Sequence, residues 1–313
     1  MEHTNETSVK FILIGLSSDP NLQMVCFLTI LVVYLITLSG NILLIFVVKI
    51  NPKLHTPMYF FLSNLSIIDL CFSSTIVPIL LINTLSKDKS ISLHGCAAQM
   101  FFSLVLGATE CLLLAVMAYD RFAAICKPLH YNLIMDKKLC IGLALAAWSG
   151  GVVNATIQVI LTFQLPYCRS HHVNHFFCEV PPFLRLSCKD TRLNVLAMYI
   201  AAGIICLSAF LLTMISYVRI ISTILMISSS QGRQKSFSTC TSHLTVVTLF
   251  YGTIMSIYLQ PRSSFSETDK AVSIVYTAIT PMLNPIIYSI RNKDVKGSVV
   301  ENILRQSNVR NKF

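Results

Sequence analysis

The chain has 313 residues, of which 54% are hydrophobic and only 12% are charged, whereas an average soluble domain is about 25% charged. This composition excludes a soluble globular domain and indicates an integral membrane protein. The formal net charge is +10, but no soluble basic domain accompanies it, so the charge does not indicate nucleic-acid binding.

Charge-poor runs predict the membrane spans, because a helix needs about 20 mostly apolar residues to cross the hydrocarbon layer. In chain order the runs occupy residues 22–48, 57–82, 96–118, 139–161, 194–218, 236–260 and 271–290. They are continuous, whereas the strands of a membrane barrel have about ten residues and alternate in polarity. The sequence therefore predicts an all-α membrane protein, with one seven-helix bundle over residues 22–290. No inverted repeat, as in many transporters, is apparent.

The positions of lysine and arginine predict which side of the membrane each loop occupies. With the N-terminus outside, the inner segments carry 15 of the 24 basic residues, and the inner side has a net charge of +11 against +1 outside. We therefore expect residues 1–21 to form an extracellular tail and residues 291–313 a cytoplasmic tail. The sequon at Asn5 lies in the extracellular tail, where it could be glycosylated.

Four of the eleven cysteines fall in segments predicted to be extracellular: Cys96, Cys168, Cys178 and Cys188. An even number in an oxidising compartment indicates two disulfides, and their spacing leaves all three pairings open. The stretch CRSHHVNHFFC also carries His171, His172 and His175, a composition that could bind zinc or copper. Oxidised cysteines could not supply thiolates, so solvated or hydrogen-bonded histidines are the alternative.

Two carboxylates lie inside predicted spans, Asp69 near the middle of the second and Glu110 in the inner half of the third. Ionisable groups within a membrane are costly and therefore indicate a functional site. The pair could share a sodium ion or a proton, form a structural hydrogen-bond network with Asn41 and Asn284, or line a transport pathway. The sequence alone does not choose among these roles, and it predicts no other cofactor.

Several longer motifs resemble those of odorant receptors, a branch of the rhodopsin-like seven-helix receptors. They follow the family's order along nearly the whole chain: Gly40-Asn41, LHTPMYFFLSNLSIIDL from Leu54, MAYDRFAAICKPLHY from Met117, Ser216-Tyr217, KSFSTCTSHL from Lys235, FYG from Phe250 and PMLNPIIYSIRNKDVKGS from Pro281. Two positions depart slightly from the family's pattern. Phe122 stands where the family usually has tyrosine, and Ser236 stands where it usually has alanine. The resemblance implies the seven-helix fold, with a short amphipathic helix after the seventh span. It also implies the disulfides Cys96–Cys178 and Cys168–Cys188.

The resemblance assigns a lock to the acid and base at the inner end of the third span. Asp120 would hold Arg121 at rest, and activation would free the arginine to meet the G protein and Tyr217. For an isolated Asp-Arg pair, charges that merely cap the span and extend toward the lipid headgroups are the alternative.

The resemblance also implies activation roles in the sixth and seventh spans. Residues 235–244, with Lys235 and His243, correspond to the inner end of helix six, which is expected to swing outward. Asn284, Pro285 and Tyr288 resemble the helix-seven element that rearranges on activation. Proline there removes a helix hydrogen bond and favours a kink.

Helical spacing and the resemblance together predict a ligand site between the third, fifth and sixth spans. The sixth span carries a stripe at i, i+3, i+4 and i+7, and the outer halves of the third and fifth face it. The predicted ligand residues are Tyr251, Ile254, Met255, Tyr258, Ser103, Leu104, Gly107, Met198, Ala202 and Ile205. In isolation such a stripe would more often be ordinary packing.

The predicted ligand is small, neutral and mostly apolar. No acidic residue lies between Ala97 and Thr109, so a protonated amine would meet no counterion in that part of the third span and would lose hydration without compensation. We expect one or two hydrogen bonds from Ser103, Tyr251 or Tyr258 to orient the ligand.

The family resemblance implies an odorant ligand, a stimulatory olfactory heterotrimeric G protein that raises cyclic AMP, and a multi-pass location in the plasma membrane of olfactory cilia, in contact with membrane lipids. Ligand and G protein would each favour the active form and so strengthen each other's binding.

Other classes of function make other demands on the sequence. A transporter or channel would need a conducting path. An enzyme would need a nucleophile beside a base or a His-rich metal motif within the spans, and neither is apparent. A chemosensory role in another tissue is the closer alternative.

Overall fold

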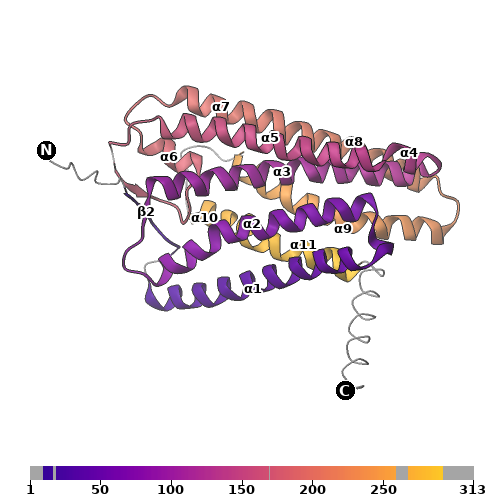
Figure 1. The fold of residues 1–313 in the computed structure, drawn as a ribbon, viewed down its shortest axis with the longest axis horizontal. Helices are drawn as coiled ribbons and strands as arrows, with labels where there is room; N and C mark the ends of the chain where they lie inside the picture. The colour runs from indigo at the N-terminus through magenta and orange to yellow at the C-terminus, as the bar shows by residue number, and fades with distance from the viewer. Residues whose placement is uncertain (1–9, 17–18, 169, 259–266, 292–313) are drawn as a thin grey trace, which may run out of the picture.

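The computed structural model describes residues 10–16, 19–168, 170–258 and 267–291, and Figure 1 shows its helices lying side by side along the long axis of the molecule. The predicted seven-helix bundle is confirmed. The first four long helices are α1 (Pro20–Ile50), α2 (Pro57–Leu85), α3 (Leu93–Cys126) and α5 (Lys137–Phe163). The fifth runs through α7 (Arg192–Ala202), η3 (Gly203–Leu207) and α8 (Ser208–Leu225), the sixth is α9 (Ser230–Tyr258), and the seventh runs through α10 (Glu267–Ile274), η4 (Val275–Ile279) and α11 (Thr280–Arg291).

Side-chain caps and prolines position the starts of several long helices. The carboxylate of Asp19 accepts a hydrogen bond from the backbone N–H of Asn21 at the start of α1, and that of Asp136 accepts from Leu139 at the start of α5. Such caps satisfy backbone donors that lack a partner within the helix. Pro20 and Pro57 occupy first helical positions, where the missing N–H has no cost.

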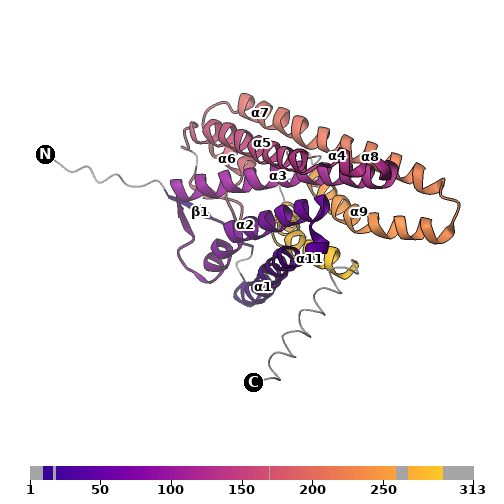
Figure 2. The same cartoon turned by 45° about the vertical axis from the view of Figure 1, so that its right-hand side comes forward.

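Helix α3 is the central element, and it contacts α2, α5, α8 and α9. Figure 2 shows it between α1 and α2 on one side and α5 and α8 on the other. Its approach to α5 is close at Gly151, where an added Cβ would lie 2.7 Å from the Val105 carbonyl oxygen and 2.5 Å from the Thr109 hydroxyl. Only glycine fits there without a shift of one of the two helices.

Helix α9 is less apolar than the other spans. Six helical stretches in the described residues are long and apolar enough to cross a membrane, and α9 is not among them. It is rich in serine and threonine, whose hydroxyls bond to backbone carbonyls four residues earlier, as Thr241 does to Phe237 and Thr245 to Thr241. These bonds satisfy hydroxyls that would otherwise be costly in hydrocarbon. The predicted span 236–260 extends two residues beyond the described part of α9.

A small three-stranded sheet covers one end of the bundle, which we call the outer end. Its strand order is β2-β1-β3, with β1 (Lys10–Leu13) antiparallel to β2 (Ser90–Ser92) and parallel to β3 (His172–Val173). Phe11 and Leu13 are fully buried, and the ring of Phe11 packs 4.9 Å from that of Phe183. The segment predicted as a simple tail therefore contributes the central strand of this sheet.

Short helices lie in the connections. They are η1 (Pro52–Leu54), η2 (Pro128–His130), α4 (Tyr131–Ile134) and α6 (Val180–Leu186). We call the end that carries α4 the inner end. Several predictions lie outside the described residues, namely Asn5, the amphipathic helix after residue 291 and the side chains of Tyr258 and Lys235.

Candidate functional site

A cavity of about 160 Å³ lies inside the bundle near its outer end. Its wall comes from α2, α3, α5, the α7–η3 helix, α9, η4 and the connection between α5 and α7. We call this connection, residues 164–191, loop two. Most lining side chains are apolar, and Met100, Phe177 and Phe250 are among the largest. A largely apolar wall with a few polar groups is typical of small-molecule sites.

Seven of the ten predicted ligand residues line this cavity: Ser103, Leu104, Gly107, Met198, Ala202, Ile205 and Ile254. Two π-helical turns also border it, because Ile205 lies in η3 and Tyr276 lies in η4. Such turns often occur at functional sites because they change which side chains face a helix neighbour.

Tyr251 lies behind the cavity wall and does not line it. Its hydroxyl donates to the Cys111 carbonyl oxygen at 3.3 Å, and its ring packs 5.3 Å from that of Phe210. The neighbouring Phe250 lines the cavity in its place, and Met255 is not among the lining residues. Helical periodicity identified the stripe of residues on α9 that includes Tyr251 and Ile254. The helix is rotated relative to that prediction, so that Phe250 and Ile254 line the cavity.

Loop two is held against α3 by a disulfide and by Gln99. Cys96 and Cys178 are bonded with their Cα atoms 5.5 Å apart, and Cys168 pairs with Cys188 at 5.8 Å. Gln99 accepts a hydrogen bond from the Cys178 backbone N–H at 2.9 Å and donates to the Thr75 carbonyl oxygen at 3.1 Å. Both disulfide pairings implied by the resemblance are therefore present, and they bring residues 177–181 to the cavity.

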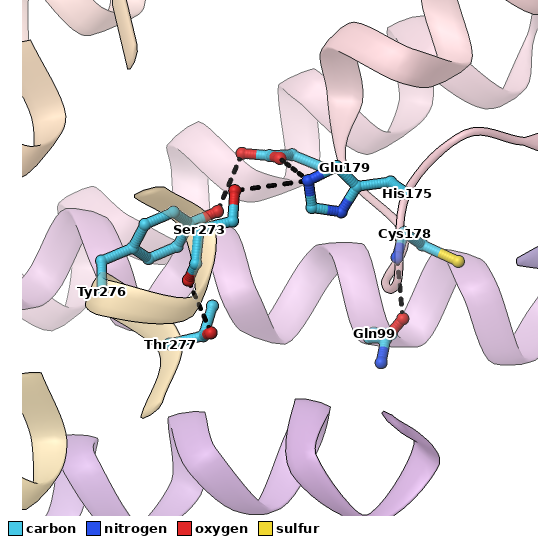
Figure 3. A network of polar contacts seen from close by, with 7 residues as sticks. All are labelled: Gln99, His175, Cys178, Glu179, Ser273, Tyr276 and Thr277. Carbon is cyan, nitrogen blue, oxygen red and sulfur yellow. Dashed lines mark hydrogen bonds and ion pairs between the residues drawn. The ribbon is translucent and has the colours of Figure 1, made fainter. Parts of the chain in front are cut away.

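A polar cluster joins loop two to the seventh helix (Figure 3). The hydroxyl of Tyr276 donates to Glu179 Oε1 at 3.1 Å, and Nε2 of His175 lies 3.3 Å from Ser273 Oγ and 3.8 Å from Glu179 Oε2. Glu179 and Tyr276 also line the cavity. The cluster thus connects the cavity wall to the junction between loop two and η4.

His175 is neutral at physiological pH. Burial lowers its pKa to about 3, and the positive charge of Lys270 acts in the same direction. The imidazole is almost fully buried and stacks on Phe176 at 4.7 Å. A neutral ring has little desolvation cost, which is compatible with this apolar packing.

Acidification is expected to destabilise the outer end through His175. In the unfolded chain this histidine gains a proton below about pH 6.5, whereas in the folded chain it stays neutral down to about pH 3. Stability therefore falls as the pH drops through this window, by about 2 kcal/mol at pH 5 relative to pH 7. Thermal unfolding of the purified protein at both pH values measures this. His175→Asn should lose less stability between the two pH values, and an equal loss would contradict the assignment.

At the inner end, Arg121 and Asp120 form an ion pair with 3.2 Å between Nη2 and Oδ2. Asp120 is fully buried, and its other oxygen accepts a 2.7 Å hydrogen bond from the hydroxyl of Tyr131 on α4. Burial, followed by the nearby Asp120 charge, raises the pKa of Tyr131, so the phenol keeps its proton. The structure places the expected lock pair together, and it adds Tyr131 as a second partner.

Tyr217 and His243 join the inner ends of α8 and α9. The Tyr217 hydroxyl and His243 Nδ1 share a 2.6 Å hydrogen bond, and the two rings are stacked 5.8 Å apart. Tyr217 is therefore engaged with α9 while Arg121 is paired with Asp120. Tyr288 is buried, and its hydroxyl has no hydrogen-bond partner among the described residues.

Asp69 and Asn284 form the polar centre of the bundle. The Asn284 amide donates to both carboxylate oxygens of Asp69, at 3.1 and 3.0 Å. Asn41 bridges α1 to the seventh helix by donating to the Pro281 carbonyl oxygen at 3.0 Å. Pro285 packs against Gly40, where an added Cβ would lie 3.0 Å from the proline ring. These contacts join α1, α2 and α11 at one level.

The histidine-rich loop does not assemble a metal site in the described residues. Cys168 and Cys178 are in disulfides, His171 and His172 are exposed, and His175 is buried. No group of three or more His, Cys, Asp or Glu side chains in the described part of the chain could hold a metal ion.

Comparison with known proteins assigns the family. A family model described as olfactory receptor matches residues 30–306. The chain is 48% identical over 301 residues to Olfactory receptor 2G6 of Homo sapiens, covering 96% of this chain and 95% of that relative. It is 50% identical over 291 residues to Olfactory receptor OR9H1 of Homo sapiens, covering 93% and 94%. The chain belongs to the olfactory receptor family.

Olfactory receptors are G protein-coupled receptors of the plasma membrane with small-molecule ligands, and they are not enzymes. The solved structure of squid rhodopsin has the same fold, with a TM-score of 0.70 and 16% identity over 92% of this chain and 87% of rhodopsin. The odorant-receptor resemblance of the sequence motifs is therefore confirmed.

Sequence reasoning missed several residues of the candidate sites: Phe177, Glu179, Val180 and Pro181 from loop two, Tyr276 from η4 and Tyr131 from α4. One available signal was the implied Cys96–Cys178 bond, because it places the residues next to Cys178 beside the start of α3. The long loop itself carries no periodic pattern that could have oriented these side chains.

Proposed function

We propose that this olfactory receptor binds a small, neutral, mostly apolar odorant in the cavity between α3, the α7–η3 helix and α9, and that binding activates a stimulatory G protein and raises cyclic AMP. The observation that carries the proposal is the cavity itself, whose wall is mostly apolar, includes seven of the predicted ligand residues and is completed by loop two. An apolar ligand gains free energy by leaving water for such a wall. Olfactory cilia are the location in which this signalling would serve odour detection.

The charge of the ligand depends on more of the wall than the stretch from Ala97 to Thr109. Glu110 and Glu179 also line the cavity, so the absence of an acid between Ala97 and Thr109 does not describe the whole site. Both carboxylates already lie in polar networks, since Glu179 accepts from Tyr276 and Glu110 lies near the Asp69 centre. A neutral ligand avoids the cost of bringing a hydrated cation into an apolar cavity.

Coupling to the G protein would use the inner contacts. Release of Arg121 from Asp120 would make the guanidinium available, and release of Tyr217 from His243 would let α8 and α9 separate. A ligand favours this change only if it binds the active form more tightly than the resting form.

The centre around Asp69 fits a sodium ion or a proton. Asp69 supplies carboxylate oxygens, and Glu110 Oε1 and Asn41 Oδ1 are buried without a hydrogen-bond partner among the described residues. Hard cations such as sodium prefer oxygen ligands of this kind. A proton on one of the two carboxyl groups could in turn be donated to one of these oxygens as a hydrogen bond. Replacing sodium by choline in the medium should change the potency of an agonist on the wild type and not on Asp69→Asn; equal behaviour of both would refute a sodium site.

The location of the ligand site is tested by filling the cavity at Gly107. An added Cβ at this residue would have no atom within 4 Å, and the residue lines the cavity. Gly107→Leu should therefore occupy ligand space without disturbing the protein, and we expect at least a roughly tenfold loss of agonist potency. The measurement is the cyclic AMP response of cells with matched surface expression.

The matched control is Gly142→Leu, because Gly142 is an exposed residue of α5 that also has no atom within 4 Å of an added Cβ. This variant should keep the wild-type response. Unchanged potency in Gly107→Leu would place the ligand elsewhere.

A further inference from the structure

Several hydrogen-bond donors in the cavity wall are already used within the protein. The hydroxyl hydrogen of Tyr276 is donated to Glu179, and that of Ser103 is donated to the Met100 carbonyl oxygen at 2.9 Å. The amide of Gln158 donates to the Ala197 carbonyl oxygen at 3.3 Å. The hydroxyls of Tyr276 and Ser103 therefore offer no hydrogen to a ligand, whereas the side-chain amides of Asn154 and Gln158 in this wall still carry N–H groups.

Glu179 is the polar group best placed to meet a ligand. It lines the cavity, and 27% of its side chain is exposed, whereas Glu110 is almost fully buried. A carboxylate has about four lone-pair positions, and the Tyr276 hydroxyl is one of the donors to this one. His175 Nε2, at 3.8 Å from Oε2, is beyond hydrogen-bond distance. Because part of this side chain is exposed at the cavity, its carboxylate can accept a hydrogen bond from a ligand.

The position of Glu179 is fixed from two sides. The Cys96–Cys178 disulfide holds the preceding residue against α3, and the bond from Tyr276 holds the carboxylate against η4 (Figure 3). An acceptor that is already oriented loses little entropy when a ligand arrives. Among the described residues that line the cavity there is no lysine, arginine or histidine, so a ligand anion would find no counterion there.

We propose that Glu179 is a specificity-determining residue that selects odorants carrying a hydroxyl group, alcohols or phenols, over counterparts that can only accept hydrogen bonds. The ligand hydroxyl donates to a Glu179 oxygen while its hydrocarbon part occupies the apolar wall. This inference rests on the proposed function, since it names the chemistry of the ligand in the same cavity. A hydrogen bond to a charged acceptor is stronger than one between neutral groups, so a hydroxyl should improve potency by at least about tenfold.

The test compares volatile alcohols with their own methyl ethers, which keep the oxygen and lose the donor. Full-length receptor is expressed with an olfactory G protein, surface receptor is quantified by antibody labelling, and the concentration for half-maximal cyclic AMP response is measured for each pair. The wild type should prefer the alcohols by at least about tenfold. In Glu179→Gln, which keeps the shape and removes the charge, the preference should fall to about threefold or less.

Two further variants separate selection from structural damage. Glu179→Asp retains a carboxylate and should keep the preference for alcohols. Asp190→Asn removes one negative charge from the exposed part of the same loop, where Asp190 lies 3.8 Å from Arg192, and should leave the preference unchanged.

The possible outcomes discriminate between the two proposals. A wild type that responds to both members of each pair without preferring alcohols, or a Glu179→Gln variant that keeps the full preference, overturns this inference and leaves the proposed function intact. If Glu179→Gln is silent, loss of the preference in Glu179→Asp also overturns it, and retention supports it. A wild type at the surface that responds to no member of any pair contradicts the proposed function, and this inference falls with it.

Discussion

Arg121→Ala is expected to reach the cell surface and to give no cyclic AMP response to any agonist of the wild type. Arg121 is the cation paired with Asp120 at the inner end of α3, and in the proposed mechanism its release provides the contact with the G protein. Alanine cannot make that contact, so ligand binding is no longer linked to the G protein. The measurement is cyclic AMP per surface receptor, with odorant binding or ligand-induced thermal stabilisation to show that the cavity is intact.

The control for Arg121→Ala is Arg219→Ala, which removes an exposed arginine from α8 at the same end of the bundle. It should signal normally. Because removal of Arg121 leaves the buried Asp120 carboxylate without its cation, some loss of surface receptor is expected. A full response from Arg121→Ala would remove the role assigned to this residue.

Cys178→Ser is expected to abolish most surface expression. Cys96 and Cys178 are both fully buried, and their bond joins loop two to the start of α3 across 82 residues of sequence. Loss of a native disulfide typically costs about 2–5 kcal/mol. Here it would also leave the Cys96 thiol and the new serine hydroxyl buried, and release Phe177 and Glu179 from the cavity wall. Surface labelling of intact cells measures the effect.

Cys188→Ser is the informative comparison, because it breaks an exposed disulfide that spans only 20 residues. The shorter closed loop predicts a smaller loss of stability. Cys71→Ser, at an exposed free cysteine of α2, should have no effect. Equal surface expression of Cys178→Ser and Cys71→Ser would show that the buried disulfide does not stabilise this receptor.

The positions of the helices could be predicted because span formation is a local property. Each run of apolar residues long enough to cross the membrane must satisfy its backbone hydrogen bonds within itself, so composition alone locates it. Even α9, with its many hydroxyls, was located as a charge-poor run, and its serine and threonine side chains bond to the backbone of the same helix. The motifs indicated Tyr217 and His243 as separate activation residues, but the hydrogen bond between them was not predicted.

The contacts of the outer end could not be predicted because they join segments far apart in the chain. Phe11 pairs with Ile91 in the sheet, and Ile12 with His172, and neither pairing has a local sequence pattern. For the same reason the sequence does not predict which face of a helix is turned toward the cavity. Periodicity identified the stripe at Tyr251, but packing on Phe210 and the bond to Cys111 turn that ring away from the cavity. Glu179 was missed because it lies in a long loop whose position depends on the disulfide from the neighbouring Cys178 to Cys96, far away in the sequence.

The most direct test of the proposed function is the cyclic AMP response of cells expressing the wild-type receptor, with and without a stimulatory olfactory G protein, to a panel of neutral volatile odorants and a matched set of amines. The proposal predicts a response to one or more neutral odorants, little response to the amines, and no response when the G protein is absent. A cyclic AMP response that is unchanged without the G protein, or amines as the strongest agonists, would contradict it.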